Sequence, residues 1–284
     1  MACSCRSFGG RREAVPQTVA TCRQLTEQGI SAMDRGDWKR AESLLARAVE
    51  TCPLDADARR QYAESLAHRG ALQQALEQLH EARRLVNTDP ALAVRAGEMC
   101  LAIDQPAQAR VMADEALTLD PKFAPAWALR GRVAGAAGQP RQALANYHRA
   151  LGYDPEIPDV VILVAETYRQ LNEPQRALVM LQALADRSPP GEQPQQVLYL
   201  EGLALSALGR YDEAARSLTQ AANADRPTPE ILCALAEIEL HAGHLARAQS
   251  CVQQALAIDP AHAPSRALSS RLAAAVQPGQ PIAR

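Results

Sequence analysis

The chain has 284 residues, of which 47% are apolar and 22% are charged, and its formal net charge at pH 7 is −2. It contains two Phe and two Trp, which excludes a large aromatic core and favours helices packed through Ala and Leu. A general nucleic-acid-binding protein carries a surplus of basic residues. This chain does not, so we expect no nucleic-acid partner.

The first stretch, residues 1–21, holds few apolar residues and shows no sustained period, so we expect a flexible leader. It lacks the apolar core of a signal peptide, and no apolar run in the chain is long enough to span a bilayer. We therefore expect a cytoplasmic protein with no transmembrane segment. The alternative is a lipid anchor in the cell envelope, because Cys3 or Cys5 followed by a polar segment resembles the start of a mature bacterial lipoprotein. That alternative requires the true start to lie upstream.

From Cys22 onwards an alanine recurs every 34 residues, with one longer gap of 37 residues. A fixed period of this length indicates a repeat architecture in which each copy is one short supersecondary unit. The seven recurring alanines are Ala41, Ala75, Ala109, Ala143, Ala177, Ala214 and Ala248.

Residues 198–221 show what one copy contains, namely two short helices joined by a turn. Gly202 lies in the first helix, where a bare backbone lets a neighbouring helix come close. Gly209 permits the left-handed turn that ends this helix, and Tyr211 begins the second one. Ala214 and Leu218 then form part of an apolar stripe at helical spacing. One such pair cannot bury its own apolar face, so it is predicted to stack on further copies.

The pattern resembles the tetratricopeptide repeat family, which has small residues at repeat positions 8, 20 and 27 and proline at position 32. The fourth copy matches best, with Trp127, Gly131, Ala143, Tyr147 and Pro155 in the family's places. The resemblance implies an all-α fold, a right-handed α-solenoid (superhelix) of helix-turn-helix repeats. The seven copies are 22–55, 56–89, 90–123, 124–157, 158–191, 195–228 and 229–262.

Three segments follow or interrupt these copies. Three extra residues within 187–196 lengthen one turn, either as a surface insertion or as a bend that contacts a partner. Residues 263–276 resemble the family's capping helix, with Ala267, Leu268, Leu272 and Val276 expected to face inward, and they complete an array of 22–276. Residues 277–284 are expected to be a disordered tail.

Motifs for catalysis are missing from the sequence. There is no Gly-rich phosphate loop, no HExxH and no GxSxG, so we expect no catalytic residue, cofactor or metal. His241 and His244 could share a metal with Cys251, although two imidazoles at a turn are more often solvated polar residues. Cys22 and Cys52 fall at the ends of one predicted hairpin and could lie close together. They are either a disulfide, which needs an oxidising compartment, or small packing residues.

The resemblance also implies a groove, because the first helices of the repeats line the concave surface in this family. Glutamate recurs at position 9, which predicts an acidic stripe suited to a segment with basic and apolar residues. The alternative is that glutamate is simply a good helix former on a solvated face. The candidate groove residues are Arg60, Glu64, Glu98, Arg132, Ile162, Glu166, Arg169, Tyr199 and Glu237.

These features predict a non-enzymatic scaffold or adaptor, of bacterial type, that binds a peptide or helical segment of a partner protein. Three other functions stay open at this level. One is an envelope-associated assembly factor, such as a pilus or secretion accessory lipoprotein. Another is a regulatory peptide sensor. The third is an enzyme, which would need catalytic residues for which this sequence shows no motif.

Overall fold

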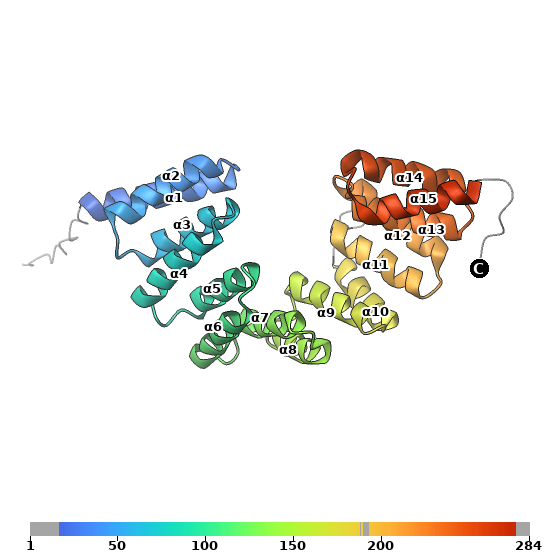
Figure 1. Cartoon of the computed structure of the whole chain (residues 1–284). Helices are drawn as coiled ribbons and strands as arrows, with labels where there is room; N and C mark the ends of the chain where they lie inside the picture. The colour runs from blue at the N-terminus through green and yellow to red at the C-terminus, as the bar shows by residue number, and fades with distance from the viewer. Residues whose placement is uncertain (1–16, 188, 190–192, 277–284) are drawn as a thin grey trace, which may run out of the picture. The chain divides into compact units, whose positions relative to one another are not determined.

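The computed structural model describes residues 17–187, 189 and 193–276, with the backbone alone for residues 275 and 276. Within these ranges the chain forms fifteen α-helices and no strand, so the predicted all-α fold of helix-turn-helix repeats is confirmed (Figure 1). The helices are α1 (Gln17–Asp34), α2 (Trp38–Thr51), α3 (Ala56–His68), α4 (Leu72–Leu85), α5 (Pro90–Ala102), α6 (Pro106–Leu119), α7 (Ala124–Ala136), α8 (Pro140–Tyr153), α9 (Pro158–Gln170), α10 (Pro174–Ala185), α11 (Gln195–Ala207), α12 (Tyr211–Ala224), α13 (Pro229–His241), α14 (Leu245–Ile258) and α15 (Ala263–Val276).

The chain divides into two compact units, which are described separately below. Unit 1 ends at Val133 and unit 2 begins at Ala134. In both units the substantial contacts join helices that are neighbours in the chain or one helix apart. This is the packing expected of a repeat array, where each copy touches only the adjacent copies.

The turn inside each helix pair has the same backbone conformation in all seven copies. The fifteenth residue of every repeat has a positive φ, between 57° and 83°. The next N–H then bonds back to the carbonyl five residues earlier, as from Arg210 to Leu205 at 2.9 Å. This is a Schellman ending, which glycine tolerates best and Asn or Asp tolerates next. The seven residues are Gly36, Gly70, Asp104, Gly138, Asn172, Gly209 and Gly243.

Aspartate ends the second helix in several copies. The backbone N–H of Asp120 still donates to Ala116 at 2.9 Å, while its side chain accepts from the N–H of Lys122, also at 2.9 Å. Pro121, which lies between them, has no N–H to donate and cannot continue the helical ladder. Asp154 and Asp259 accept from the N–H two residues on in the same way.

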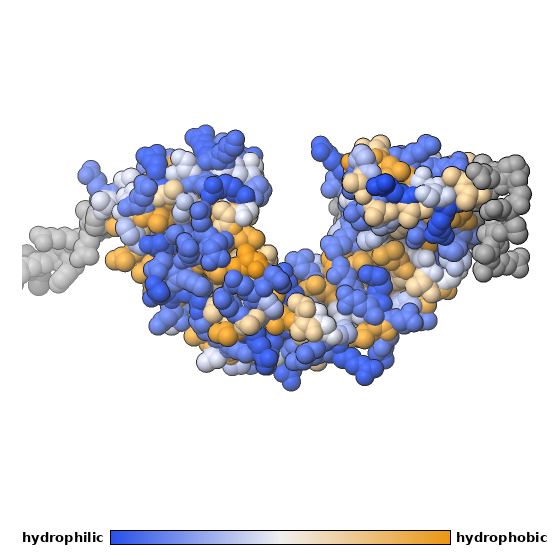
Figure 2. Space-filling model, viewed as in Figure 1, coloured by the Kyte–Doolittle hydropathy of each residue, from blue (hydrophilic) through white to orange (hydrophobic). Residues whose placement is uncertain are grey.

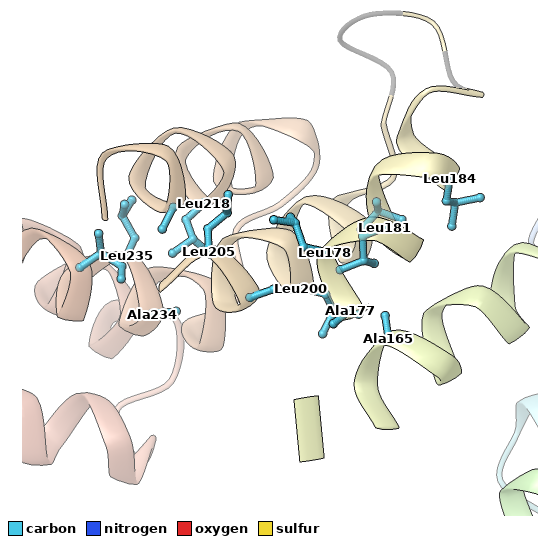
Figure 3. Packing of buried hydrophobic residues seen from close by; sticks show 14 of the residues in the cluster. Ala165, Ala177, Leu178, Leu181, Leu184, Leu200, Leu205, Leu218, Ala234 and Leu235 are labelled. Carbon is cyan, nitrogen blue, oxygen red and sulfur yellow. The ribbon is translucent and has the colours of Figure 1, made fainter. Parts of the chain in front are cut away.

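Small residues allow the helices of each unit to pack closely. In unit 1, Ala63, Ala75, Ala82, Ala96 and Ala109 are fully buried within one apolar cluster. The corresponding cluster of unit 2 places leucines of α10, α11 and α12 against alanines of α9 and α13 (Figure 3). Side chains no larger than a methyl group let the backbones approach, and leucines fill the remaining space.

Two expectations about the ends of the array are corrected. Residues 17–21, assigned to the leader, form the first turns of α1. Within this segment the Thr21 hydroxyl donates to the Gln17 carbonyl at 2.9 Å, and the Cys52 Sγ at the end of α2 lies 3.7 Å from the Thr18 carbonyl oxygen. In α15, Leu268 and Leu272 are buried as expected, but Ala267 is exposed and Ser265 is buried instead. The Val276 side chain, residues 1–16 and the tail 277–284 lie outside the described residues.

Candidate interaction surface

A hollow of about 690 Å³ opens on the first helices of the repeats in unit 1. We call it the α1–α7 hollow, because α1, α3, α5 and α7 supply most of its wall, while α2 and α4 contribute their first residues. Its lining residues are Met33, Asp34, Trp38, Glu64, Ala67, His68, Leu72, Arg95, Glu98, Met99, Ala102 and Arg132. Three of the candidate groove residues, Glu64, Glu98 and Arg132, are therefore brought together here.

Four charged side chains form a continuous network along one wall of this hollow. Arg95 holds Glu64 through two hydrogen bonds, from Nε to Oε1 at 2.7 Å and from Nη2 to Oε2 at 2.6 Å. The same guanidinium donates from Nη1 to Glu98 Oε2 at 2.8 Å. Arg132 donates to the other oxygen of Glu98 at 3.2 Å. Residues from three consecutive first helices are thereby linked side by side.

The network is electrically balanced, with two glutamates and two arginines. Hydrogen bonding to Glu64 keeps the pKa of Arg95 above its ordinary value, against the opposing effect of burial. The side chains are only partly covered, with 38% of Arg95 and 32% of Glu64 exposed. Solvent therefore screens the attraction, and the network acts mainly by holding the side chains in fixed positions. The prediction of an acidic stripe considered the glutamates and did not include Arg95. It therefore does not describe this wall, where both glutamates are paired with arginines.

An aromatic stack and several apolar side chains form the other part of the wall. The rings of Trp38 and His68 lie 3.6 Å apart and are nearly parallel, with an interplanar angle of 7°. Met33, Leu72 and Met99 lie beside them in the lining. On the visible face of unit 1, apolar residues likewise interrupt a mostly hydrophilic surface (Figure 2). The α1–α7 hollow therefore combines apolar contact area with fixed hydrogen-bonding groups.

The remaining predicted residues are distributed differently. Arg60 of unit 1 bonds to Asp57 on its own helix at 2.6 Å and is absent from the lining of the hollow. In unit 2, Tyr199 is half-buried, and burial raises its pKa. Ile162 is also half-buried, whereas Arg169 and Glu237 are exposed. The Glu166 carboxylate accepts a hydrogen bond from the Gln196 amide at 3.3 Å.

Arg95 and Trp38 are lining side chains that the predicted groove residues do not include. Arg95 occupies position 6 of its repeat, next to position 5, from which groove residues were predicted. Trp38 begins the second helix of the first repeat, and its aromatic side chain at a helix start was the available signal. The same relation recurs in unit 2, where Tyr211 begins α12 and stacks on His241 with ring centroids 5.4 Å apart.

The candidate metal ligands are engaged in other contacts. His241 stacks on Tyr211, and His244 Nδ1 lies 2.7 Å from Glu239 Oε2. Within the described part of the chain, no three His, Cys, Asp or Glu side chains are grouped closely enough to hold a metal ion. The same residues contain no helix that is both long enough and apolar enough to cross a membrane.

Comparisons with known proteins agree with this architecture. Two family models, both described as tetratricopeptide repeat, match the chain, one over residues 26–90 and the other over 136–198 and 205–272. No match was found among curated protein sequences.

Solved structures resemble the fold at low sequence identity. A tetratricopeptide repeat protein from Parabacteroides merdae is 15% identical, with a TM-score of 0.66 over 89% of this chain and 99% of its own. PilW, a type IV pilus biogenesis factor, is 21% identical, with a TM-score of 0.62 over 70% and 91%. YrrB, a repeat protein with an unusual peptide-binding site, is 18% identical, with a TM-score of 0.53 over 68% and 97%.

Proposed function

Because the chain belongs to the tetratricopeptide repeat family, we propose that it is a non-enzymatic adaptor that binds a segment of another protein in the α1–α7 hollow. The observation that carries this proposal is the hollow itself, about 690 Å³ in volume and lined by the first helices of four consecutive repeats. A preformed surface of this kind suits an extended or helical peptide, because little ordering is needed on binding.

The balanced network changes the partner that we infer. Glu64 and Glu98 already accept hydrogen bonds from Arg95 and Arg132, so a basic segment gains little from them. The Trp38–His68 stack and the neighbouring Met33 offer apolar contact area instead. Aromatic and Arg side chains supply much of the binding energy at protein interfaces. The partner segment is therefore expected to carry aromatic or aliphatic anchors, with polar groups near Arg132.

The likeness to PilW and YrrB concerns the fold alone, since both are less than 25% identical to this chain. A role in envelope assembly, or as a peptide sensor, is therefore not part of the proposal. The apolar side chains of the α1–α7 hollow and its paired glutamates determine which peptides are worth testing.

A displayed library of random peptides, selected against the full chain, provides ligands of defined sequence. The affinity of a selected peptide is then measured by calorimetry for the unaltered protein and for Trp38→Ala. Loss of an aromatic anchor at an interface weakens binding roughly tenfold or more, which is the expected result. Circular dichroism checks that the variant remains helical.

Tyr211→Ala is the matched control. Tyr211 also begins a second helix and stacks on a histidine, but it belongs to unit 2 and is not a lining residue of the α1–α7 hollow. We expect Tyr211→Ala to bind the selected peptide with the same affinity as the unaltered protein. Equal loss in both variants, or no loss in Trp38→Ala, would show that the peptides bind elsewhere.

A further inference from the structure

Two cysteines of the first repeat lie together where its two helices meet. Cys22 is in α1 and is fully buried, while Cys52 follows the last residue of α2 and is half-buried. Both pack in the same apolar cluster with Leu25, Ala48 and Ala58. Both are free thiols in the structure.

Each thiol contacts the backbone of the other helix. The Cys22 Sγ lies 3.6 Å from the carbonyl oxygen of Ala48, which also accepts the backbone N–H of Cys52 at 2.9 Å. The Cys52 Sγ lies 3.7 Å from the carbonyl oxygen of Thr18, one helical turn before Cys22. The Cys22 Sγ also lies 3.6 Å from Asp55 Oδ2, in the residues that follow Cys52. The two thiols therefore lie at the same junction, where α1 packs against the end of α2.

The two thiols differ in reactivity. Burial raises the pKa of Cys22 to about 12, and the neighbouring Cys52 thiol and Asp55 carboxylate add to the shift. Thiols react as thiolates, so the buried Cys22 is a poor initial nucleophile. Cys52 is more exposed to solvent and is the sulfur that an oxidant reaches first.

We propose that Cys22 and Cys52 form an oxidation site that closes to an intramolecular disulfide by exchange with a small disulfide compound. The Cys52 thiolate attacks one sulfur of the oxidant, and the other sulfur leaves as a thiolate. Cys22 then loses its proton, and its sulfur attacks the Cys52 sulfur of the mixed disulfide, which expels the second thiolate. Two protein thiols are oxidised, the oxidant is reduced to two thiols, and the two protons from the cysteines end on those products.

The bond would act on the end of the array. Helix α1 packs against α2 and α3, and it has no preceding repeat helix to cover it among the described residues. Terminal elements of repeat arrays open more readily than internal ones. A disulfide between residues 22 and 52 restricts the unfolded hairpin and therefore favours the closed one. Met33 and Asp34 of the α1–α7 hollow lie three helical turns further along α1, so this proposal does not depend on peptide binding.

The test uses the full chain with Cys3 and Cys5 replaced by Ser, so that these thiols do not compete. The folded protein is equilibrated with oxidised glutathione, the remaining thiols are blocked, and the tryptic peptides are mapped by mass spectrometry. The expected product is a disulfide-linked pair of the peptides 13–23 and 48–59 from monomeric protein. Amide exchange within α1 is expected to slow roughly tenfold or more on oxidation.

Two single variants complete the test. Cys52→Ser is expected to abolish both the linked peptides and the slower exchange, and it avoids altering the fully buried Cys22. Cys251→Ser is the matched control, because Cys251 is also a half-buried thiol, and it should leave both results unchanged. The proposal is overturned if glutathione remains attached to Cys52, if either cysteine pairs with a different one, or if the bond forms only in urea.

Discussion

At the scale of single residues, the close approach of helices depends on positions where a methyl group no longer fits. A Cβ added to Gly202 would lie 2.5 Å from Leu218 Cγ and 2.8 Å from its Cδ2. Leu218 is fully buried, so it cannot move away without disturbing its own neighbours. Gly29 meets Leu45 in the same manner in the first repeat. The small residue is thus needed for packing, beyond any preference of the backbone.

We expect Gly202→Ala to lower the free energy of unfolding by about 1–3 kcal/mol, because overpacking forces buried side chains from their preferred positions. Gly152 in α8 is the matched control, since a Cβ there would have no atom within 4 Å. Gly152→Ala should raise stability by roughly 0.5–1 kcal/mol, the helix preference of alanine over glycine. Urea unfolding of both variants measures the difference. A stabilised Gly202→Ala would contradict the packing argument.

Glu201 is a residue whose burial should make stability depend on pH. Burial raises its pKa above the ordinary 4.5, more than hydrogen bonds from Ser217 and Gln182 lower it. The folded state therefore holds this proton more tightly than the unfolded chain does. The group's contribution to stability consequently falls as the pH rises from the ordinary value through the raised one.

Glu201→Gln removes the charge while keeping an oxygen that can accept from Ser217, whose Oγ lies 3.3 Å from Glu201 Oε2. We expect the variant to be more stable than the unaltered protein at about pH 7 and equal to it near about pH 4. Urea unfolding at the two pH values tests this. If the difference in stability between Glu201→Gln and the unaltered protein were the same at both pH values, burial of the charge would not be the cause of that difference.

At the scale of helices, α15 covers the apolar face that the last repeat leaves open. Leu268 and Leu272 pack against Cys233, Ala236 and Val252, and all five are buried. Terminal repeats need such a cover, because no further copy follows to bury their apolar side chains. With Ala267 exposed, the buried side chains among those described in α15 are Ser265, Leu268 and Leu272, at spacings of three and four residues.

Leu272→Ala is expected to lower the free energy of unfolding of the last repeat by about 2–5 kcal/mol, the usual loss for a buried leucine. Ala273→Ser on the same helix is the control, because Ala273 is exposed and its change should stay within about 0.5 kcal/mol. Thermal unfolding followed by circular dichroism compares the two. Equal midpoints would mean that α15 contributes little to the array.

At the scale of the whole molecule, contacts between nearest neighbours should keep the effect of a mutation local. The substantial contacts join helices that are adjacent or one apart in the chain. Stability in such an array is approximately a sum of repeat terms and interface terms. The two units should therefore respond separately to a change that lies deep within one of them.

Hydrogen exchange measured by mass spectrometry on Gly202→Ala tests this locality. We expect faster exchange in α11, α12 and α13, which surround the altered contact, and unchanged exchange in α3, α4 and α5 of unit 1. The physical reason is that no side chain of unit 1 loses a contact. A uniform increase along the chain would instead indicate that the protein unfolds as one cooperative body.

The sequence by itself determined the family, the paired helices and the turn positions, because these depend on local residue types that recur every 34 residues. Gly209, for example, predicts its left-handed turn without any knowledge of the neighbouring repeat. Even so, the start of α1 at Gln17 was missed, because residues 17–21 precede the first copy of the repeated pattern.

The chemistry of the candidate site was decided by the tertiary structure alone. Glu64 and Arg95 are 31 residues apart, and only the stacking of two repeats brings their side chains together. From the sequence alone, a glutamate on a helix is predicted to be an unpaired negative charge on the surface, because the side chain that pairs with it belongs to another repeat. In unit 1, tertiary packing pairs the two glutamates of the predicted acidic stripe with arginines. Such a side-chain pair depends on geometry that residue types at a fixed spacing do not contain.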